Sequence, residues 1–131
     1  TWQAVARMYN EEASKFDGSM AIGFALLSID KEDGTPSTYI SSRMGMEATS
    51  LTRTLKTLEE KGLIYRQKNP DDGRGVLIYL TDLGKQMREQ SKITVLKFND
   101  VVKQNVPEEK LQHFMEVADI INELITEKKV F

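Results

Sequence analysis

The chain has 131 residues, 40% of them hydrophobic and 29% charged, and its formal net charge is −2. This composition is ordinary for a globular protein that buries a core, and it excludes wholesale disorder. The chain has no cysteine, which excludes disulfides, thiolate metal sites and thiol-based redox sensing. No apolar run approaches the roughly 18 residues that span a bilayer, so we expect a cytoplasmic protein that does not contact a membrane.

The first two predicted helices differ in how much of their surface is apolar. Five apolar residues recur at helical spacing near the N-terminus: Trp2, Val5, Tyr9, Ala13 and Phe16. They predict an amphipathic helix over residues 2–16 that ends at residues 17–18. Ser19 is a suitable N-cap for a second helix, which is apolar nearly all round and is therefore expected to be central and buried. This second helix should stop before the turn-rich segment 33–36.

Two further helices are expected before the middle of the chain. Residues 37–45 predict a short helix with three inward residues: Tyr39, Ile40 and Met44. Residues 47–61 give the clearest pattern, because four apolar residues recur in steps of three, four and three: Ala48, Leu51, Leu55 and Leu58. Gly62 then supplies the left-handed stop that often ends a helix.

A hairpin and a long helix follow. Residues 63–68 and 76–80 predict two strands, and the segment 69–75 between them is dense in turn formers, as a hairpin tip should be. Thr81 is a plausible N-cap for a helix that runs to about Gln104. The expected architecture is mainly α with a small β-wing, and residues 82–104 form a connecting helix.

The final helix carries more apolar surface than one packing contact needs. Pro107 suits its first turn, and eight apolar residues form its broad face: Leu111, Phe114, Val117, Ala118, Ile120, Ile121, Leu124 and Ile125. The first helix carries a similar surplus. Because exposed apolar area of this size promotes aggregation, we infer that residues 1–18 and 105–131 pack against a second copy of the chain. The alternative is that both apolar stripes fold back on their own domain.

Helix 47–61 has a polar face opposite its apolar stripe. At 100° per residue, Arg53 lies near the centre of that face, flanked by Thr49, Ser50, Lys56 and Thr57. Arginine can grip a guanine edge through two hydrogen bonds, hydroxyl groups can bond bases or phosphates, and lysine supplies a phosphate contact. Taken alone, the pattern also fits an ordinary solvated face.

The charges near this helix strengthen the DNA-binding interpretation. Residues 43–76 carry seven cations and five anions, a local charge of +2 that leaves −4 for the remainder. Arg74 lies between two glycines at the hairpin tip, where it could extend into a narrow, electronegative minor groove. Asp72 could hold its guanidinium group through a charge-assisted hydrogen bond; the alternative is an exposed ion pair of little value.

These residues resemble a known family. The segments SLTRTLKTLEEKGLI (50–64) and DGRGVLIYLTDLG (72–84) are similar to the recognition helix and wing of MarR-type winged-helix transcriptional regulators. The resemblance implies a single MarR-like domain over residues 1–131, with a winged helix-turn-helix lobe over 35–81 and dimerisation helices at both ends. It implies an obligate homodimer on double-stranded DNA with a pseudo-palindromic operator, usually as a repressor.

The resemblance also assigns roles to individual residues. The helix placed in the major groove would carry Thr49, Ser50, Thr52, Arg53 and Lys56. Arg74, steadied by Asp72, would enter the minor groove. Many members of the family bind small aromatic or anionic effectors, and five residues are candidates for lining such a cleft: Tyr9, Phe16, Met20, Phe24 and Tyr39. Aromatic residues at helical spacing also occur as ordinary core. The absence of cysteine excludes the peroxide-sensing mode of one branch of the family.

The sequence is less consistent with two other classes of function. A winged-helix module that binds protein rather than DNA typically loses cations from the exposed helix and the wing, whereas this chain keeps Arg53, Lys56 and Arg74. An enzyme is disfavoured because the chain has no phosphate-binding loop and no nucleophile motif. One histidine, His113, supplies too few ligands for a zinc site. We therefore expect no metal, no cofactor and no catalytic residue.

Overall fold

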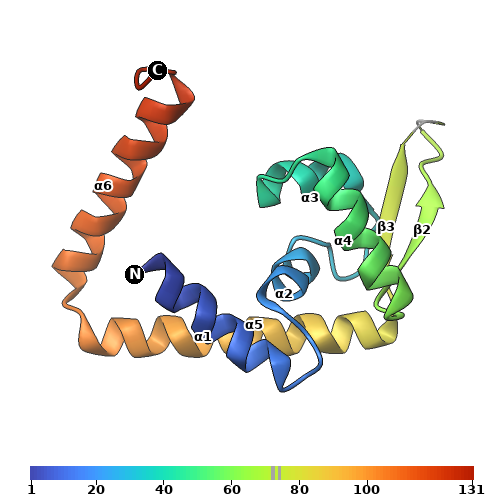
Figure 1. Ribbon diagram of the computed structural model, residues 1–131, viewed down its shortest axis with the longest axis horizontal. Coiled ribbons are helices and arrows are strands. Elements are labelled where there is room, and N and C mark those ends of the chain that lie inside the picture. Colours follow the sequence, from blue (N-terminus) through green and yellow to red (C-terminus); the bar gives the residue numbers. More distant parts are fainter. Residues whose placement is uncertain (72, 74) are drawn as a thin grey trace. The chain divides into compact units, whose positions relative to one another are not determined.

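The computed structural model describes residues 1–71, 73 and 75–131, which form two compact units, Thr1–Thr94 and Val95–Phe131. The first unit holds most of the helices and the sheet (Figure 1): α1 (Trp2–Ser14), α2 (Met20–Leu27), β1 (Thr35–Pro36), α3 (Ser37–Met44), α4 (Ala48–Glu60), β2 (Ile64–Lys68) and β3 (Val76–Leu80). Helix α5 (Asp82–Asn105) begins in the first unit and continues into the second, which also contains α6 (Glu108–Thr126). The predicted class, mainly helical with a small β-wing, is confirmed.

Most helix ends lie where the capping residues predict them. The Ser19 hydroxyl accepts a hydrogen bond from Ile22 N at 3.2 Å and so caps α2. Gly62, with φ of 71°, turns the chain out of α4. Thr81 Oγ1 accepts from Gly84 N at 3.0 Å at the start of α5. Helix α1, in contrast, ends at Ser14 rather than residue 16, because the chain turns at Asp17 with a φ of 55°.

The three strands form an antiparallel sheet in the order β1-β3-β2. The predicted hairpin is confirmed, and Tyr65 on β2 stacks on Tyr79 of β3 with ring centroids 5.3 Å apart. The sequence did not predict β1, where Thr35 pairs with Ile78. A two-residue strand has no alternating pattern, and Pro36 is tolerated because β1 is an edge strand.

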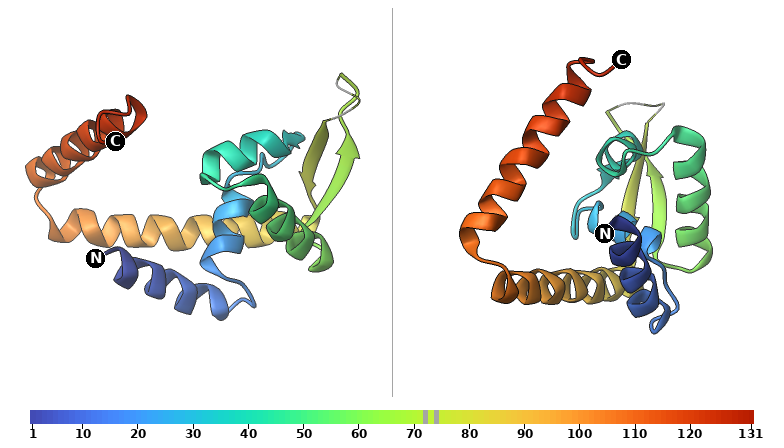
Figure 2. Two further views of the ribbon diagram at one scale, coloured as in Figure 1. Left: turned by 45° about the horizontal axis from the view of Figure 1, so that its top comes forward. Right: turned by 60° about the vertical axis from the view of Figure 1, so that its left-hand side comes forward.

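One hydrophobic core joins α2, α3, α4 and the sheet. Its buried members lie in these elements or directly beside them: Ile22, Ala25, Leu26, Ile29, Ile40, Leu51, Leu55, Leu58, Leu63, Ile64, Ile78 and Leu80. Helix α4 lies beside the β2–β3 hairpin (Figure 2). The winged-helix lobe, expected over residues 35–81, therefore shares its core with α2.

Three residues expected on buried faces are exposed. Tyr39 is 50% exposed. Helix α3 buries the side that carries Ile40, and the adjacent Tyr39 points about 100° away from that side. Phe24 is 48% exposed: α2 is covered on the side of Ala25 and Leu26, not all round as expected. Ala48 is exposed in the first turn of α4, ahead of the part that the core covers.

Both ends of the chain carry uncovered apolar side chains. In the first unit, Trp2 on α1 is 66% exposed. In the second unit, none of the residues of α6 is buried, and Phe114 is 68% exposed. Among the described residues, no helix combines the length and apolarity needed to cross a bilayer.

Candidate nucleic-acid interface

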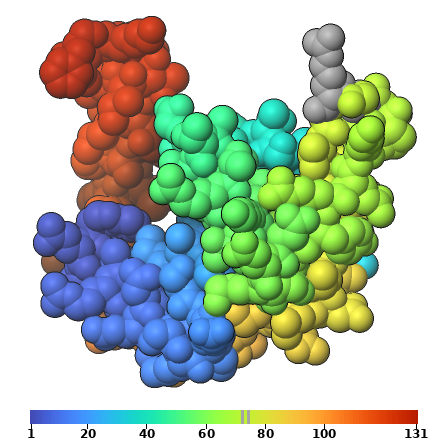
Figure 3. All heavy atoms as spheres, turned by 45° about the vertical axis from the view of Figure 1, so that its right-hand side comes forward, coloured from blue at the N-terminus to red at the C-terminus, as the bar shows by residue number. Residues whose placement is uncertain are grey.

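Helix α4 presents a polar face to solvent. Leu51, Leu55 and Leu58 anchor its other side in the core. The five residues expected to meet DNA are all exposed: Thr49, Ser50, Thr52, Arg53 and Lys56. Figure 3 shows this helix (green) uncovered beside the yellow-green hairpin. The apolar stripe thus turns the expected residues to the surface, as the helical spacing required.

The hydroxyl groups on α4 are not equivalent. Thr52 Oγ1 donates to Ala48 O at 2.9 Å, and Thr57 makes the same kind of bond to Arg53 O at 3.1 Å. Within the described residues, the Thr49 and Ser50 side chains make no hydrogen bond. Thr49 and Ser50 can therefore donate or accept, whereas Thr52 retains its acceptor lone pairs. Thr57, expected beside Arg53 on the solvent face, is half-buried.

The cations of α4 are available for a partner. Arg53 is exposed and forms no ion pair with any carboxylate in the described ranges. Lys56 Nζ lies 3.9 Å from Glu60 Oε1 one turn along the helix, and both side chains are largely exposed. Such a pair contributes little and is readily broken. Both cations can thus turn to an anion without leaving a buried charge behind.

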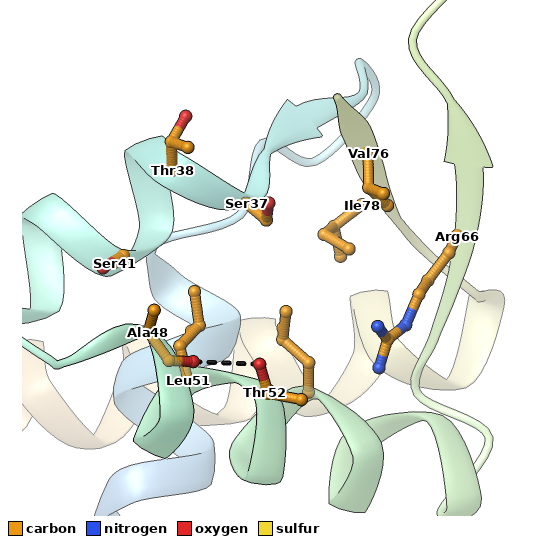
Figure 4. Close-up of a pocket in the computed structure, with 10 residues that line it drawn as sticks. Ser37, Thr38, Ser41, Ala48, Leu51, Thr52, Arg66, Val76 and Ile78 are labelled. Carbon is orange, nitrogen blue, oxygen red and sulfur yellow. Dashed lines mark hydrogen bonds between the residues drawn. The ribbon is translucent and has the colours of Figure 1, made fainter. Parts of the chain in front are cut away.

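A pocket of about 250 Å³ adjoins α4 (Figure 4). Ser37 and Thr38, at the start of α3, line one side of it, and Thr52 of α4 lines another. No pattern in the sequence points to Ser37 or Thr38 individually, although residues 37–45 are rich in serine. Ser41 lines the pocket too, but its Oγ donates to Met46 O at 2.8 Å and so ties the turn between α3 and α4.

Strand β2 carries two cations, Arg66 and Lys68. Arg66 points from β2 toward α4 (Figure 4), where its Nε lies 3.1 Å from Glu59 Oε2. Its charge is therefore partly compensated, and it links the hairpin to α4. Lys68 is exposed at the end of β2 and has no ion-pair partner in the part of the chain that is described.

The base of the hairpin tip is closed by short-range hydrogen bonds. Asn69 N donates to Gly75 O at 3.0 Å, and Asn69 Oδ1 accepts from Asp71 N at the same distance. The two wing residues assigned from the sequence, Asp72 and Arg74, lie outside the described residues.

The five candidates for an effector cleft lie in different surroundings. Tyr9 and Met20 are half-buried, and burial raises the pKa of the Tyr9 phenol. Phe16 and Phe24 are exposed. Tyr39 lines a separate pocket of about 420 Å³, and the other four are not among the residues that line it. Among the described residues, no three His, Asp or Glu side chains lie close enough to hold a metal ion.

Comparison with known proteins gives a consistent result. The MarR family model matches residues 19–76. The regulator YdgJ of Bacillus subtilis (strain 168), named an HTH-type transcriptional regulator, is 32% identical over 78 residues, covering 60% of this chain and 48% of YdgJ. SarZ of Staphylococcus saprophyticus, also named an HTH-type transcriptional regulator, is 31% identical over 97 residues, covering 73% of this chain and 66% of SarZ. The chain thus aligns with about half to two thirds of these relatives.

A solved structure extends the similarity over nearly the whole fold. The crystal structure of a mutant MarR from E. coli complexed with operator DNA matches with a TM-score of 0.80 and 26% identity, covering 91% of this chain and 86% of that one. The region that matches this structure extends beyond residues 19–76 in both directions. The chain thus contains a MarR-family domain, and nearly its whole length adopts the fold of that MarR structure.

Proposed function

We propose that this chain binds double-stranded DNA sequence-specifically and regulates transcription by placing α4 in the major groove. The observation that carries the proposal is the exposed Arg53, which forms no ion pair with any described residue, together with Thr49 and Ser50 one turn earlier, whose hydroxyl groups make no hydrogen bond within the same part of the chain. A guanidinium group that is not engaged elsewhere can make two bonds to a guanine edge. The similarity to a MarR structure complexed with operator DNA supports the same use of the fold.

Other residues would fix the position of the helix on the duplex. Lys56 and Lys68 are exposed cations beside the hydroxyl-bearing face, and they would supply salt-dependent affinity for phosphates. Ser37 and Thr38 offer hydroxyl groups where α3 begins, a favourable place for a phosphate. Arg74 enters the proposal from the sequence alone, as a minor-groove contact steadied by Asp72.

The proposal includes a homodimer. The uncovered apolar residues of α1 and α6 are what a second copy would bury, and a two-fold dimer reads a pseudo-palindromic operator. Occupation of a promoter by such a dimer represses transcription. Release by a small aromatic or anionic ligand belongs to the same proposal, with Tyr9, Phe16, Met20 and Phe24 as the residues that it would contact.

Base contacts and phosphate contacts can be separated by two substitutions on α4. Arg53→Ala should cost about 1–3 kcal/mol of operator affinity and relax the preference at one base pair in each half-site. Lys56→Ala should weaken operator and random DNA alike and lower the salt dependence by about one phosphate contact. Fluorescence anisotropy titrations at several salt concentrations measure both quantities.

Glu60→Gln is the matched control, because it leaves both cations in place and removes only the partner of Lys56. It should bind operator at least as tightly as the unaltered chain. If Arg53→Ala lowered operator and random DNA affinity equally, Arg53 would not read bases. If the unaltered chain failed to shift any duplex even at low salt, a winged-helix module that binds protein would replace the DNA-binding proposal.

A further inference from the structure

A second pocket is lined by residues of α3, of α5 and of the segment between α2 and α3, and α4 contributes none of its lining residues. It has a volume of about 420 Å³ and combines charged groups with a small apolar wall: Asp30, Asp33, Pro36, Tyr39, Arg43 and Arg88 are among its lining residues. We call it the α3–α5 pocket, after the two helices that carry its arginines. Its volume lies within the range of small-molecule sites.

The cations of the α3–α5 pocket come from two helices. Arg88 Nε donates to Ile29 O at 3.1 Å, which fixes the side chain and leaves its terminal nitrogens for another acceptor. Arg43 Nη1 lies 3.4 Å from the Tyr39 hydroxyl. No carboxylate of the described residues forms an ion pair with either guanidinium group. Two anchored guanidinium groups therefore face the same pocket with donors to spare.

The anions of the pocket come from the loop between α2 and β1. Asp30 Oδ1 accepts hydrogen bonds from Asp33 N at 2.8 Å and from Glu32 N at 2.9 Å. These two bonds, from Asp33 first and Glu32 second, lower the pKa of Asp30 below its ordinary value, and the positive charge of Arg88 makes a smaller contribution in the same direction, so the carboxylate is ionised at neutral pH. The Asp33 carboxylate has no hydrogen bond or ion pair with any described residue.

Opposite charges thus line one pocket: Arg88 attracts the Asp30 carboxylate, but among the described residues neither arginine forms an ion pair with a carboxylate of the pocket. A simple anion would be attracted by the two arginines but repelled by the two carboxylates. A simple cation would be attracted by the carboxylates but repelled by the arginines. A molecule that carries both charges a few bonds apart satisfies both sets of groups, and Leu27 and Pro36 offer an apolar wall for its remaining atoms.

We propose that the α3–α5 pocket binds a small zwitterion of the α-amino acid type. Its carboxylate accepts hydrogen bonds from Arg43 and Arg88, and its ammonium group donates to Asp33 and to the free oxygen of Asp30. Paired, charge-assisted hydrogen bonds of this kind give orientation as well as affinity. The inference goes beyond the proposed function and does not depend on DNA binding.

The test uses the full chain without DNA. The common L-amino acids are screened one at a time at millimolar concentration, by thermal unfolding and by the NMR signals of the arginine Nε–H groups. At least one amino acid should raise the melting temperature, because a ligand that binds the native state stabilises it, and should shift the Arg43 and Arg88 signals. Its deaminated and decarboxylated analogues should each bind at least about tenfold more weakly.

Two exposed residues provide variants that should fold normally. Arg43→Gln and Asp33→Asn should each weaken binding by about tenfold. Lys92→Gln, an exposed cation on α5 outside the pocket, should leave it unchanged. The proposal would be overturned if no amino acid bound, if the deaminated carboxylate bound as tightly as the amino acid, or if both pocket variants bound normally. Since each measurement omits DNA, failure here is distinguishable from failure of the proposed function.

Discussion

Replacing Gly84 by alanine should lower the free energy of unfolding by about 3 kcal/mol or more. A Cβ atom at Gly84 would lie 1.9 Å from the carbonyl oxygen of Leu63, far inside van der Waals contact. This oxygen has little freedom to move, because it accepts a hydrogen bond from Thr81 N at 3.0 Å, while Leu63 N donates to Leu58 O at 2.9 Å. Glycine at position 84 is therefore what allows α5 to start directly against the turn between α4 and β2.

Chemical denaturation with urea measures this loss, and Gly73→Ala is the matched control. No heavy atom of the other described residues lies within 4 Å of an added Cβ at Gly73, and no left-handed backbone is needed there. That substitution should leave stability unchanged or raise it by a few tenths of a kcal/mol, because alanine restricts the unfolded chain. If the two variants had the same free energy of unfolding, an added Cβ at Gly84 would not clash with the carbonyl oxygen of Leu63.

Ile121→Asp should convert the proposed dimer into a monomer and lower operator affinity by at least about a hundredfold. Ile121 lies at the centre of the broad apolar face of α6 and is 51% exposed. A carboxylate there would have to be buried without a partner if a second copy covered the face, which is costly. Separate monomers would then bind each half-site without the gain in effective concentration that a dimer provides.

Glu116→Gln, on the opposite side of α6, is the control and should remain dimeric. Analytical ultracentrifugation gives the oligomeric state of both variants, and anisotropy titrations give their operator affinity. Circular dichroism checks that α6 is retained in the Ile121 variant. A chain that sediments as a monomer before any substitution, or an Ile121 variant that remains a dimer, would contradict the assignment of this face.

Long periodic segments and caps were the parts of the fold that the sequence could predict. The steps between Leu51, Leu55 and Leu58 placed α4, and Gly62 ended it, because these signals depend only on residues close together in the chain. The exposed face of α4 followed directly, since the residues opposite a buried stripe must face away from the core.

Features that depend on distant residues could not be predicted in this way. Whether Tyr39 faces inward depends on which side of α3 meets the core, and a helix of eight residues gives too short a pattern to decide. Strand β1 exists because β3 offers a partner edge more than forty residues later in the chain. The pairing of Arg66 with Glu59 likewise follows from the hairpin folding back on α4.

The α3–α5 pocket illustrates the same limit. Asp30, Asp33 and Arg43 lie close together in the sequence, but Arg88 comes from another helix and is fixed by the carbonyl oxygen of Ile29. No spacing rule links these positions, so their shared charge pattern emerges only once the helices are packed.

The most direct test of DNA recognition by α4 is selection of bound duplexes from a random pool by the unaltered full chain. The expected result is a two-fold symmetric site whose half-sites lie about one helical turn apart. When the selection is repeated with the Arg53→Ala variant, the base preference at one base pair of each half-site should be lost. Recovery of no enriched sequence, or of a site whose preferences are unchanged by Arg53→Ala, would contradict the account.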